Sequence, residues 1–273
     1  MINRDLDDGR TILIRQEDHA AAAGCFAEHW GNDRFAPSSR QASLVCAAHL
    51  HDTHYHELEA VPPVDVAQGR PFGHRQLPFE PWHLEALQRN IDSVSKQDAY
   101  AGALVSMHHT GLMQNRYGMI RSWRDGQQQP GSARRIRPEL QAFIEGLEQK
   151  QKMILADLGL EGEMQREFDY RLLQVCDLLS LYICCDGYQG LEMQVASIGP
   201  VPNALASKSE DDLRLIPQDD GSIRMEPYPF DQDELEITLP VLMVSRQPGA
   251  SEDVIRQSVL ATPPSNLTFL FKR

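Results

Sequence analysis

The sequence has no long apolar run, and basic residues are scarce relative to acidic ones. No stretch approaches the roughly eighteen apolar residues that a membrane-spanning helix needs, so we expect no membrane protein. Lysine and arginine number 26 against 39 aspartates and glutamates, and the formal net charge is −13. This charge argues against nucleic acid or an anionic membrane surface as the main partner. Residues 1–10 are polar and acidic, so we expect no signal peptide.

Cysteine is also sparse and does not form an extracellular disulfide pattern. The five cysteines lie within apolar segments of helical character, and their number is odd. Reduced thiols in a core are typical of a cytoplasmic protein, which is the location we expect. A small phosphorylated substrate stays compatible with the acidic chain, because the charge of a bound metal can locally outweigh the overall field.

The chain is long enough to bury a sizeable core. Its 273 residues are 41% hydrophobic and 24% charged, which suits one large domain or one domain with an appendage. Apolar residues at helical spacing predict helices over residues 17–30, 38–51, 81–95, 99–115, 138–158 and 165–185. Residues 61–81 are rich in proline and glycine and predict a long irregular loop, a kind of segment that often carries function.

The pattern changes after residue 187. Alternating apolar and polar residues predict strands over residues 212–216, 222–226, 234–244 and 266–272. An isolated β-branched run, TILIR at residues 11–15, predicts one further strand that joins this C-terminal sheet. We therefore predict a mainly α protein with a small antiparallel sheet: a helical domain over residues 1–189 and a β-rich subdomain over residues 190–273.

Histidines and carboxylates recur in a set order along the predicted helices. The order is His19, His51-Asp52, His83, His108-His109 and Asp177. These positions are too far apart in sequence to form a local metal loop, so only a compact helical fold could gather them. Five imidazoles and two carboxylates form a ligand mixture that borderline transition metals favour. The pattern indicates metal chemistry without indicating a substrate.

Each of these residues also has an ordinary structural explanation. Asp177 lies in an apolar helix, where an unpaired carboxylate is costly, so it should be metal-bound, protonated or paired, for example with Arg171. Of His108 and His109, at least one must face inward, because consecutive helical residues point about 100° apart. His83, at a predicted helix start, is the weakest member of the set, and a place on the surface is its main alternative explanation.

Other histidines prevent a decision from composition alone. His49, His54 and His56 surround the His51-Asp52 pair and could compete as ligands. His19 lies in the first turn of its helix among ordinary N-terminal acids.

The order of these residues resembles the HD superfamily, all-helical metal-dependent phosphohydrolases named for an adjacent His-Asp pair. The additional histidines resemble its two-metal branch, which includes cyclic-dinucleotide phosphodiesterases and diiron oxygenases. The resemblance covers residues 15–186 and implies an HD-domain-like helical bundle with one or two divalent transition metals (Fe, Mn, Zn or Ni). It implies a first-metal set of His19, His51, Asp52 and Asp177 and a second-metal set of His83, His108 and His109. Asp52 would be the catalytic residue that bridges the two metals.

Several local strings (RQEDHA, AEHWG, LVSMHHTGL, LLQVCDLLSLYIC and PYPF) also resemble an uncharacterised bacterial family known only as a domain of unknown function. That second resemblance implies no activity. The chain lacks the Gly-Tyr-Pro signature of the cyclic-dinucleotide phosphodiesterases, and Thr53 rather than lysine follows Asp52. Both differences argue against a standard nucleotide substrate.

The HD resemblance implies a metal-dependent phosphohydrolase that acts on an unidentified small phosphorylated molecule. Arg116, Lys96 or Arg70 could bind its phosphate, although residues of this kind are more often plain surface charges. Two alternatives stay open: an iron-dependent oxygenase with the same ligands, or a non-catalytic metal- or ligand-binding protein with a degenerate site. The oligomeric state is also open, with a homodimer as one option.

Overall fold

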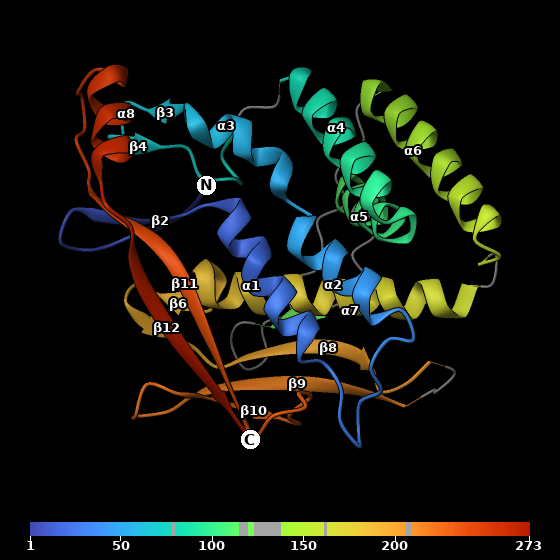
Figure 1. Ribbon diagram of the computed structural model, residues 1–273. Helices are drawn as coiled ribbons and strands as arrows, with labels where there is room; N and C mark the ends of the chain where they lie inside the picture. The colour runs from blue at the N-terminus through green and yellow to red at the C-terminus, as the bar shows by residue number, and fades with distance from the viewer. Residues whose placement is uncertain (78–79, 115–119, 123–137, 161–162, 206–208) are drawn as a thin grey trace.

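The computed structural model describes residues 1–77, 80–114, 120–122, 138–160, 163–205 and 209–273. The chain folds into a mixed α and β structure in which one large sheet curls around a helical layer (Figure 1). Helices α1 and α7 lie against this sheet, while α4, α5 and α6 lie on the side of the helical layer that faces away from it (Figure 1). In the described part of the chain, no helix has the length and apolarity needed to cross a membrane.

The large sheet joins the two ends of the chain. Among the described residues it has eight strands in the order β1-β2-β11-β12-β10-β9-β8-β5, and every neighbouring pair is antiparallel except β10 and β12. The strands are β1 (Ile2–Asp5), β2 (Arg10–Ile14), β5 (Ile120–Ser122), β8 (Ala196–Pro202), β9 (Glu210–Pro217), β10 (Ile223–Glu226), β11 (Glu234–Ser245) and β12 (Ser265–Lys272). Two short hairpins stand apart: β3 (Val64–Asp65) with β4 (Arg70–Pro71), and β6 (Tyr188–Gln189) with β7 (Glu192–Met193).

The helices provide the other layer. They are α1 (Gln16–Glu28), α2 (Gln41–Leu50), α3 (His56–Ala60), α4 (Trp82–Gln97), α5 (Ala99–Met113), α6 (Pro138–Asp157), α7 (Glu163–Leu181) and α8 (Glu252–Ala261). A 3₁₀ turn, η1 (Thr53–Tyr55), follows α2, and a π turn, η2 (Tyr182–Asp186), follows α7. Helix α5 begins where the Asp98 side chain accepts a hydrogen bond from the Ala101 backbone N–H, a standard N-cap.

Strand β2 connects the sheet directly to the first helix. It pairs with β11 in a register that sets Leu13 opposite Leu242, so residues 10–14 lie in the sheet formed by the C-terminal strands. Only Arg15 separates β2 from α1. The pairing therefore fixes where α1 begins.

One hydrophobic core is shared by residues on both sides of the predicted domain boundary at residues 189 and 190. Phe26 of α1 stacks on Phe230, with 5.7 Å between ring centroids, and meets the edge of Phe271 of β12 at 5.1 Å. Trp30 packs against Phe230 at 6.1 Å. Phe230 of the PYPF segment thus packs on the end of α1, and the helices and the sheet share a common interior.

The prediction of a mainly α, HD-domain-like helical bundle with a small sheet is wrong, as is the broader all-α expectation. The sheet is large and makes the protein mixed α and β. The prediction missed β1, β5 and β8 of this sheet. Two of them, β1 and β8, have sequences that are poor strand patterns. The polar INRD sequence forms β1, and the proline-containing ASIGPVP sequence forms β8. Tertiary pairing overrides the low strand propensity of proline and asparagine at both places.

Candidate metal centre

Three helical segments bring four of the predicted residues together. His19 projects from α1, His51 ends α2 with Asp52 directly after it, and Asp177 comes from α7. The Nε2 atom of His19 lies 3.0 Å from Asp177 Oδ1 and 3.3 Å from His51 Nε2. His51 Nε2 lies 3.6 Å from Asp177 Oδ1 and 3.7 Å from Asp52 Oδ2. The cluster is buried, with 0–1% of the two imidazoles exposed.

The outer nitrogens of the two histidines are held by hydrogen bonds. The Ser180 hydroxyl donates to the His19 carbonyl oxygen at 2.8 Å, so the same hydroxyl accepts from His19 Nδ1 at 2.7 Å. His51 Nδ1 donates to the Ala48 carbonyl at 2.8 Å. These bonds assign the proton of each neutral ring to Nδ1 and leave both Nε2 lone pairs facing the carboxylates. Hydrogen bonds of this kind to the second nitrogen are typical of metal-binding histidines.

The electrostatics of the cluster show that it attracts positive charge. Burial lowers the pKa of His51, but the charge of Asp52 and the hydrogen bond with Asp177 outweigh burial and raise it to about 9. Burial raises the pKa of Asp177, yet its hydrogen bonds with His19 and His51 hold it well below the ordinary value. The Nε2 lone pairs of the two histidines and the carboxylates of Asp52 and Asp177 therefore face one another, and a proton or a metal cation between them would be stabilised.

A second group shares Asp52. Asp52, His54 and His109 each offer a ligand atom, and these three atoms lie within 4.8 Å of one another, as do those of His19, His51 and Asp52. His109 donates from Nε2 to the His51 carbonyl at 2.8 Å, which leaves its Nδ1 lone pair available. Burial lowers the pKa of His54 to about 3 and also lowers that of His109, so both rings are neutral, the form that binds metals. The described residues can therefore hold a metal in either group.

The other half of the His-His pair also reaches this centre. His108 Nε2 lies 4.0 Å from Asp52 Oδ1, and its ring centroid is 4.8 Å from that of His51. Both residues of the pair are buried, so the helix presents both inward rather than one inward and one outward.

His83 belongs to neither group of possible ligands found among the described residues. It sits in the first turn of α4, where its Nδ1 accepts a hydrogen bond from the Glu80 backbone N–H at 3.2 Å and its ring packs on Trp82 at 4.1 Å. His54 stands near Asp52 instead. From the sequence, His54 was predicted only as a possible competing ligand. The hydrophobic pattern does not show that a 3₁₀ turn follows Asp52 and brings His54 close to it.

Two of the three predicted phosphate-binding residues, Arg70 and Lys96, lie in the part of the chain that the structure describes. Arg70 is buried in β4 and forms an ion pair with Asp5 at 2.8 Å, which gives it a structural role. Lys96 is exposed in the last turn of α4, and Arg116 lies outside the described residues. The alternative partner proposed for Asp177, Arg171, pairs instead with Glu210.

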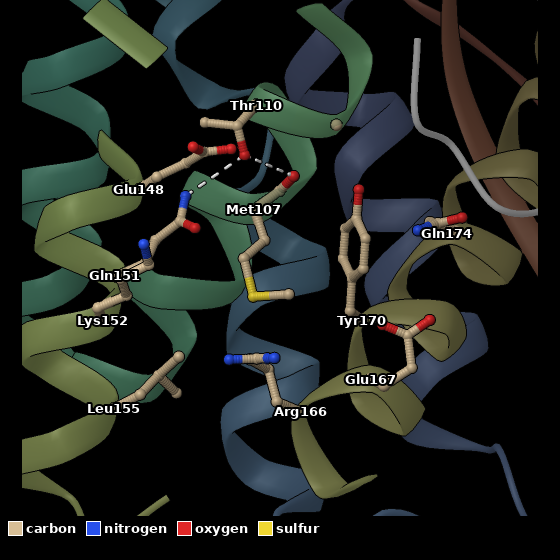
Figure 2. A pocket seen from close by; sticks show the side chains of 11 residues that line it. Met107, Thr110, Glu148, Gln151, Lys152, Leu155, Arg166, Glu167, Tyr170 and Gln174 are labelled. Carbon is tan, nitrogen blue, oxygen red and sulfur yellow. Dashed lines mark hydrogen bonds between the residues drawn. The ribbon is translucent and has the colours of Figure 1, made fainter. Parts of the chain in front are cut away.

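A cavity of about 450 Å³ opens between α5, α6 and α7 (Figure 2). Its lining residues are Met107, Thr110, Gly111, Glu148, Gln151, Lys152, Leu155, Arg166, Glu167, Tyr170 and Gln174. Thr110 directly follows His109, and Gln174 lies about one helical turn before Asp177. Two of the lining residues are therefore close in sequence to candidate ligands, while the candidate ligands themselves do not line the cavity. The sequence did not single out its two cationic residues, Lys152 and Arg166.

A further trio of possible ligands lies at the other end of α1. Cys25, Glu28 and His29 have ligand atoms within 4.8 Å of one another, but Glu28 is exposed. His29 already contacts Asp231 at 3.1 Å, and Glu28 contacts His49 at 3.0 Å. These ordinary surface ion pairs explain the trio without a metal.

Comparison with known proteins gives a family but no activity. No curated protein matches the chain, and no solved structure matches it. One family model, described as "Protein of unknown function (DUF3891)", matches residues 1–246, a span that includes both metal-ligand groups, the cavity and most of the sheet. The chain therefore belongs to the DUF3891 family of proteins of unknown function.

Proposed function

We propose that this protein is a metal-dependent phosphohydrolase that acts on a small phosphorylated molecule. The observation that carries the proposal is the buried cluster of His19, His51, Asp52 and Asp177. Neighbouring ligand atoms around a first-row metal are about 3–3.5 Å apart when each bond is roughly 2.0–2.2 Å. The spacing of His19 Nε2 from His51 Nε2 and from Asp177 Oδ1, at 3.3 and 3.0 Å, fits that requirement.

The ligand chemistry limits the choice of metal. Imidazole and carboxylate together suit Fe, Mn, Zn or Ni, and we propose one or two such ions per chain. When bound, a divalent ion of this kind lowers the pKa of a coordinated water and polarises a phosphoryl oxygen. The protein contributes orientation: Ser180 and the Ala48 carbonyl fix the two imidazoles, and burial keeps bulk water from the cluster.

The cavity between α5, α6 and α7 supplies space for the rest of the substrate. Its volume lies in the range of small-molecule sites. Two cations, Lys152 and Arg166, are balanced by two carboxylates, Glu148 and Glu167. A strongly anionic ligand would favour an excess of cations, so this lining favours a polar leaving group with little net charge. The phosphoryl group would then lie at the metal centre, whose candidate ligands His109 and Asp177 are close in sequence to Thr110 and Gln174.

Cysteine chemistry is consistent with a reducing environment. All five cysteines are free, and Cys176 and Cys184 are fully buried. We therefore place the reaction in the cytoplasm.

The direct test is a panel of phosphomonoesters and phosphodiesters with the Mn²⁺-loaded protein. We expect turnover that Asp52→Asn lowers on the order of 100-fold or more, because the change weakens a metal-ligating carboxylate. Asp92→Asn is the matched control, since Asp92 is exposed on α4, and it should keep full activity. No turnover with any of Mn, Fe, Zn or Ni would contradict the proposal. Substrate-dependent oxygen uptake by the iron form without phosphatase activity would replace it with an oxygenase.

A further inference from the structure

We infer that the centre holds a second divalent metal at Asp52, His54 and His109, and that His54 completes this second site in place of the predicted His83. The inference rests on the proposed function, because the second site shares Asp52 with the first. It adds a ligand that the resemblance does not imply.

The first step is the state of His54. Its Nδ1 atom is buried, and no hydrogen-bond partner for it lies in the part of the chain that the structure describes. Leaving a buried imidazole nitrogen unsatisfied costs about 1–3 kcal/mol. Its ring meets that of His109 edge-on, with 4.9 Å between centroids and an interplanar angle of 88°. The ring therefore faces another candidate ligand rather than solvent alone.

The second step is the orientation of the two partners. His109 uses Nε2 to donate to the His51 carbonyl, so Nδ1 is the nitrogen that can bind a cation. Asp52 presents its two oxygens to different sides: Oδ2 lies 3.7 Å from His51 Nε2, and Oδ1 lies 4.0 Å from His108 Nε2. A carboxylate placed this way can bridge two metals about 3.5–4 Å apart.

The third step separates His54 from His83. The Nδ1 atom of His83 accepts the Glu80 backbone N–H, and the ring packs on the partly exposed Trp82. His54, in contrast, follows Asp52 by two residues, and η1 turns the chain so that both side chains lie within one ligand group. The second site is therefore local to the end of α2, with His109 reaching it from α5.

The test is the metal content of purified protein after loading with Mn²⁺ and removal of excess ion. We expect about two equivalents per chain in the wild type and about one in His54→Ala. His83→Ala should keep two equivalents. Cys25→Ala should also keep two, which excludes a contribution from the surface trio. Circular dichroism and thermal unfolding identify folded variants, and His54→Gln serves as a second variant if His54→Ala does not fold.

Electron paramagnetic resonance gives a readout independent of activity. Two Mn²⁺ ions that share a carboxylate should show a coupled spectrum, which His54→Ala should convert into that of an isolated ion. A wild type with one equivalent, unchanged in His54→Ala, would overturn the second site and leave the proposed hydrolase intact. Loss of a metal in His83→Ala but not in His54→Ala would also overturn it. A wild type that binds no metal would instead end the proposed function itself.

Discussion

The two ends of α1 bury a polar and an apolar side chain to the same extent but surround them with different partners. Near its start, His19 is 1% exposed and faces two carboxylates. Two turns later, Phe26 is fully buried between Phe230 and Phe271. Burial of a Phe side chain contributes about 1.5–3 kcal/mol to stability, whereas burial of polar groups costs free energy unless partners satisfy them.

The difference indicates that packing at the aromatic end stabilises the position of α1. The polar end depends on that fixed position to keep His19 beside the carboxylates. The sheet contacts both ends of α1. Phe271, which packs on Phe26, belongs to β12, and β2 ends only one residue before α1 begins. The candidate site is built from side chains at α1, the end of α2 and α7. Without a cation, the carboxylates of Asp52 and Asp177 repel each other, so contacts outside the site must hold these helices together. We therefore expect stability to depend mainly on the sheet contacts and metal affinity mainly on the cluster.

The largest effect on stability should come from the aromatic end. Phe230→Ala removes a fully buried ring that contacts Phe26, Trp30 and Tyr228. We expect the free energy of unfolding to fall by about 3–5 kcal/mol, measured by urea denaturation. Leu260→Ala is the control, because Leu260 is 62% exposed and should change stability by less than about 0.5 kcal/mol. A small loss in Phe230→Ala would show that the aromatic cluster around Phe230 does not hold α1.

The next effect should come from the metal. At a free Mn²⁺ concentration of about 100 times the dissociation constant, the ion should stabilise the folded protein by about 2.7 kcal/mol, seen as a rise in melting temperature that a chelator reverses. His51→Ala should reduce this rise, and His51→Ala combined with His54→Ala should abolish it, because the two changes remove one ligand from each group. Phe230→Ala, measured under conditions where it stays folded, should keep it. A metal-induced rise that survives in the double variant would place the binding site elsewhere and break the comparison between the two ends of the helix.

The sequence predicts the centre better than it predicts the fold. The periodicity of apolar residues placed His19, His51 and Asp177 on separate helices, and the requirement that a buried carboxylate be satisfied identified Asp177 as unusual. The structure brings these residues together. Their role as metal ligands stays a prediction until metal is measured.

What the sequence could not supply was local geometry at element ends. The proposed role of His54 depends on the η1 turn after Asp52, and a three-residue turn leaves no periodic signal. The sheet was underestimated for a similar reason. Strands β11 and β12 alternate clearly, but β1 and β8 gain their conformation from pairing with β2 and β9 rather than from their own composition.

The smallest effect we predict concerns an exposed carboxylate at a turn of the sheet, far less buried than those of the candidate metal centre. Asp220, in the turn between β9 and β10, accepts hydrogen bonds from the Ser222 hydroxyl at 2.5 Å and the Ser222 backbone N–H at 2.9 Å. These bonds, with a further contribution from Lys272, lower the pKa of Asp220 to about 2 from the ordinary value of 3.8.

Because the folded-state pKa of Asp220 lies below the unfolded one, the carboxylate contributes stability above pH 3.8 and loses it as the pH falls toward 2. Between pH 5 and pH 3 the wild type should therefore lose slightly more stability than Asp220→Asn, measured by urea denaturation at each pH. Asp219→Asn, at the exposed neighbouring position, is the matched control and should follow the wild type. Parallel curves for Asp220→Asn and the wild type would show that the turn does not favour the charged carboxylate. In that case the surroundings of Asp220 would not favour its charged form, whereas those of the buried Asp177 do.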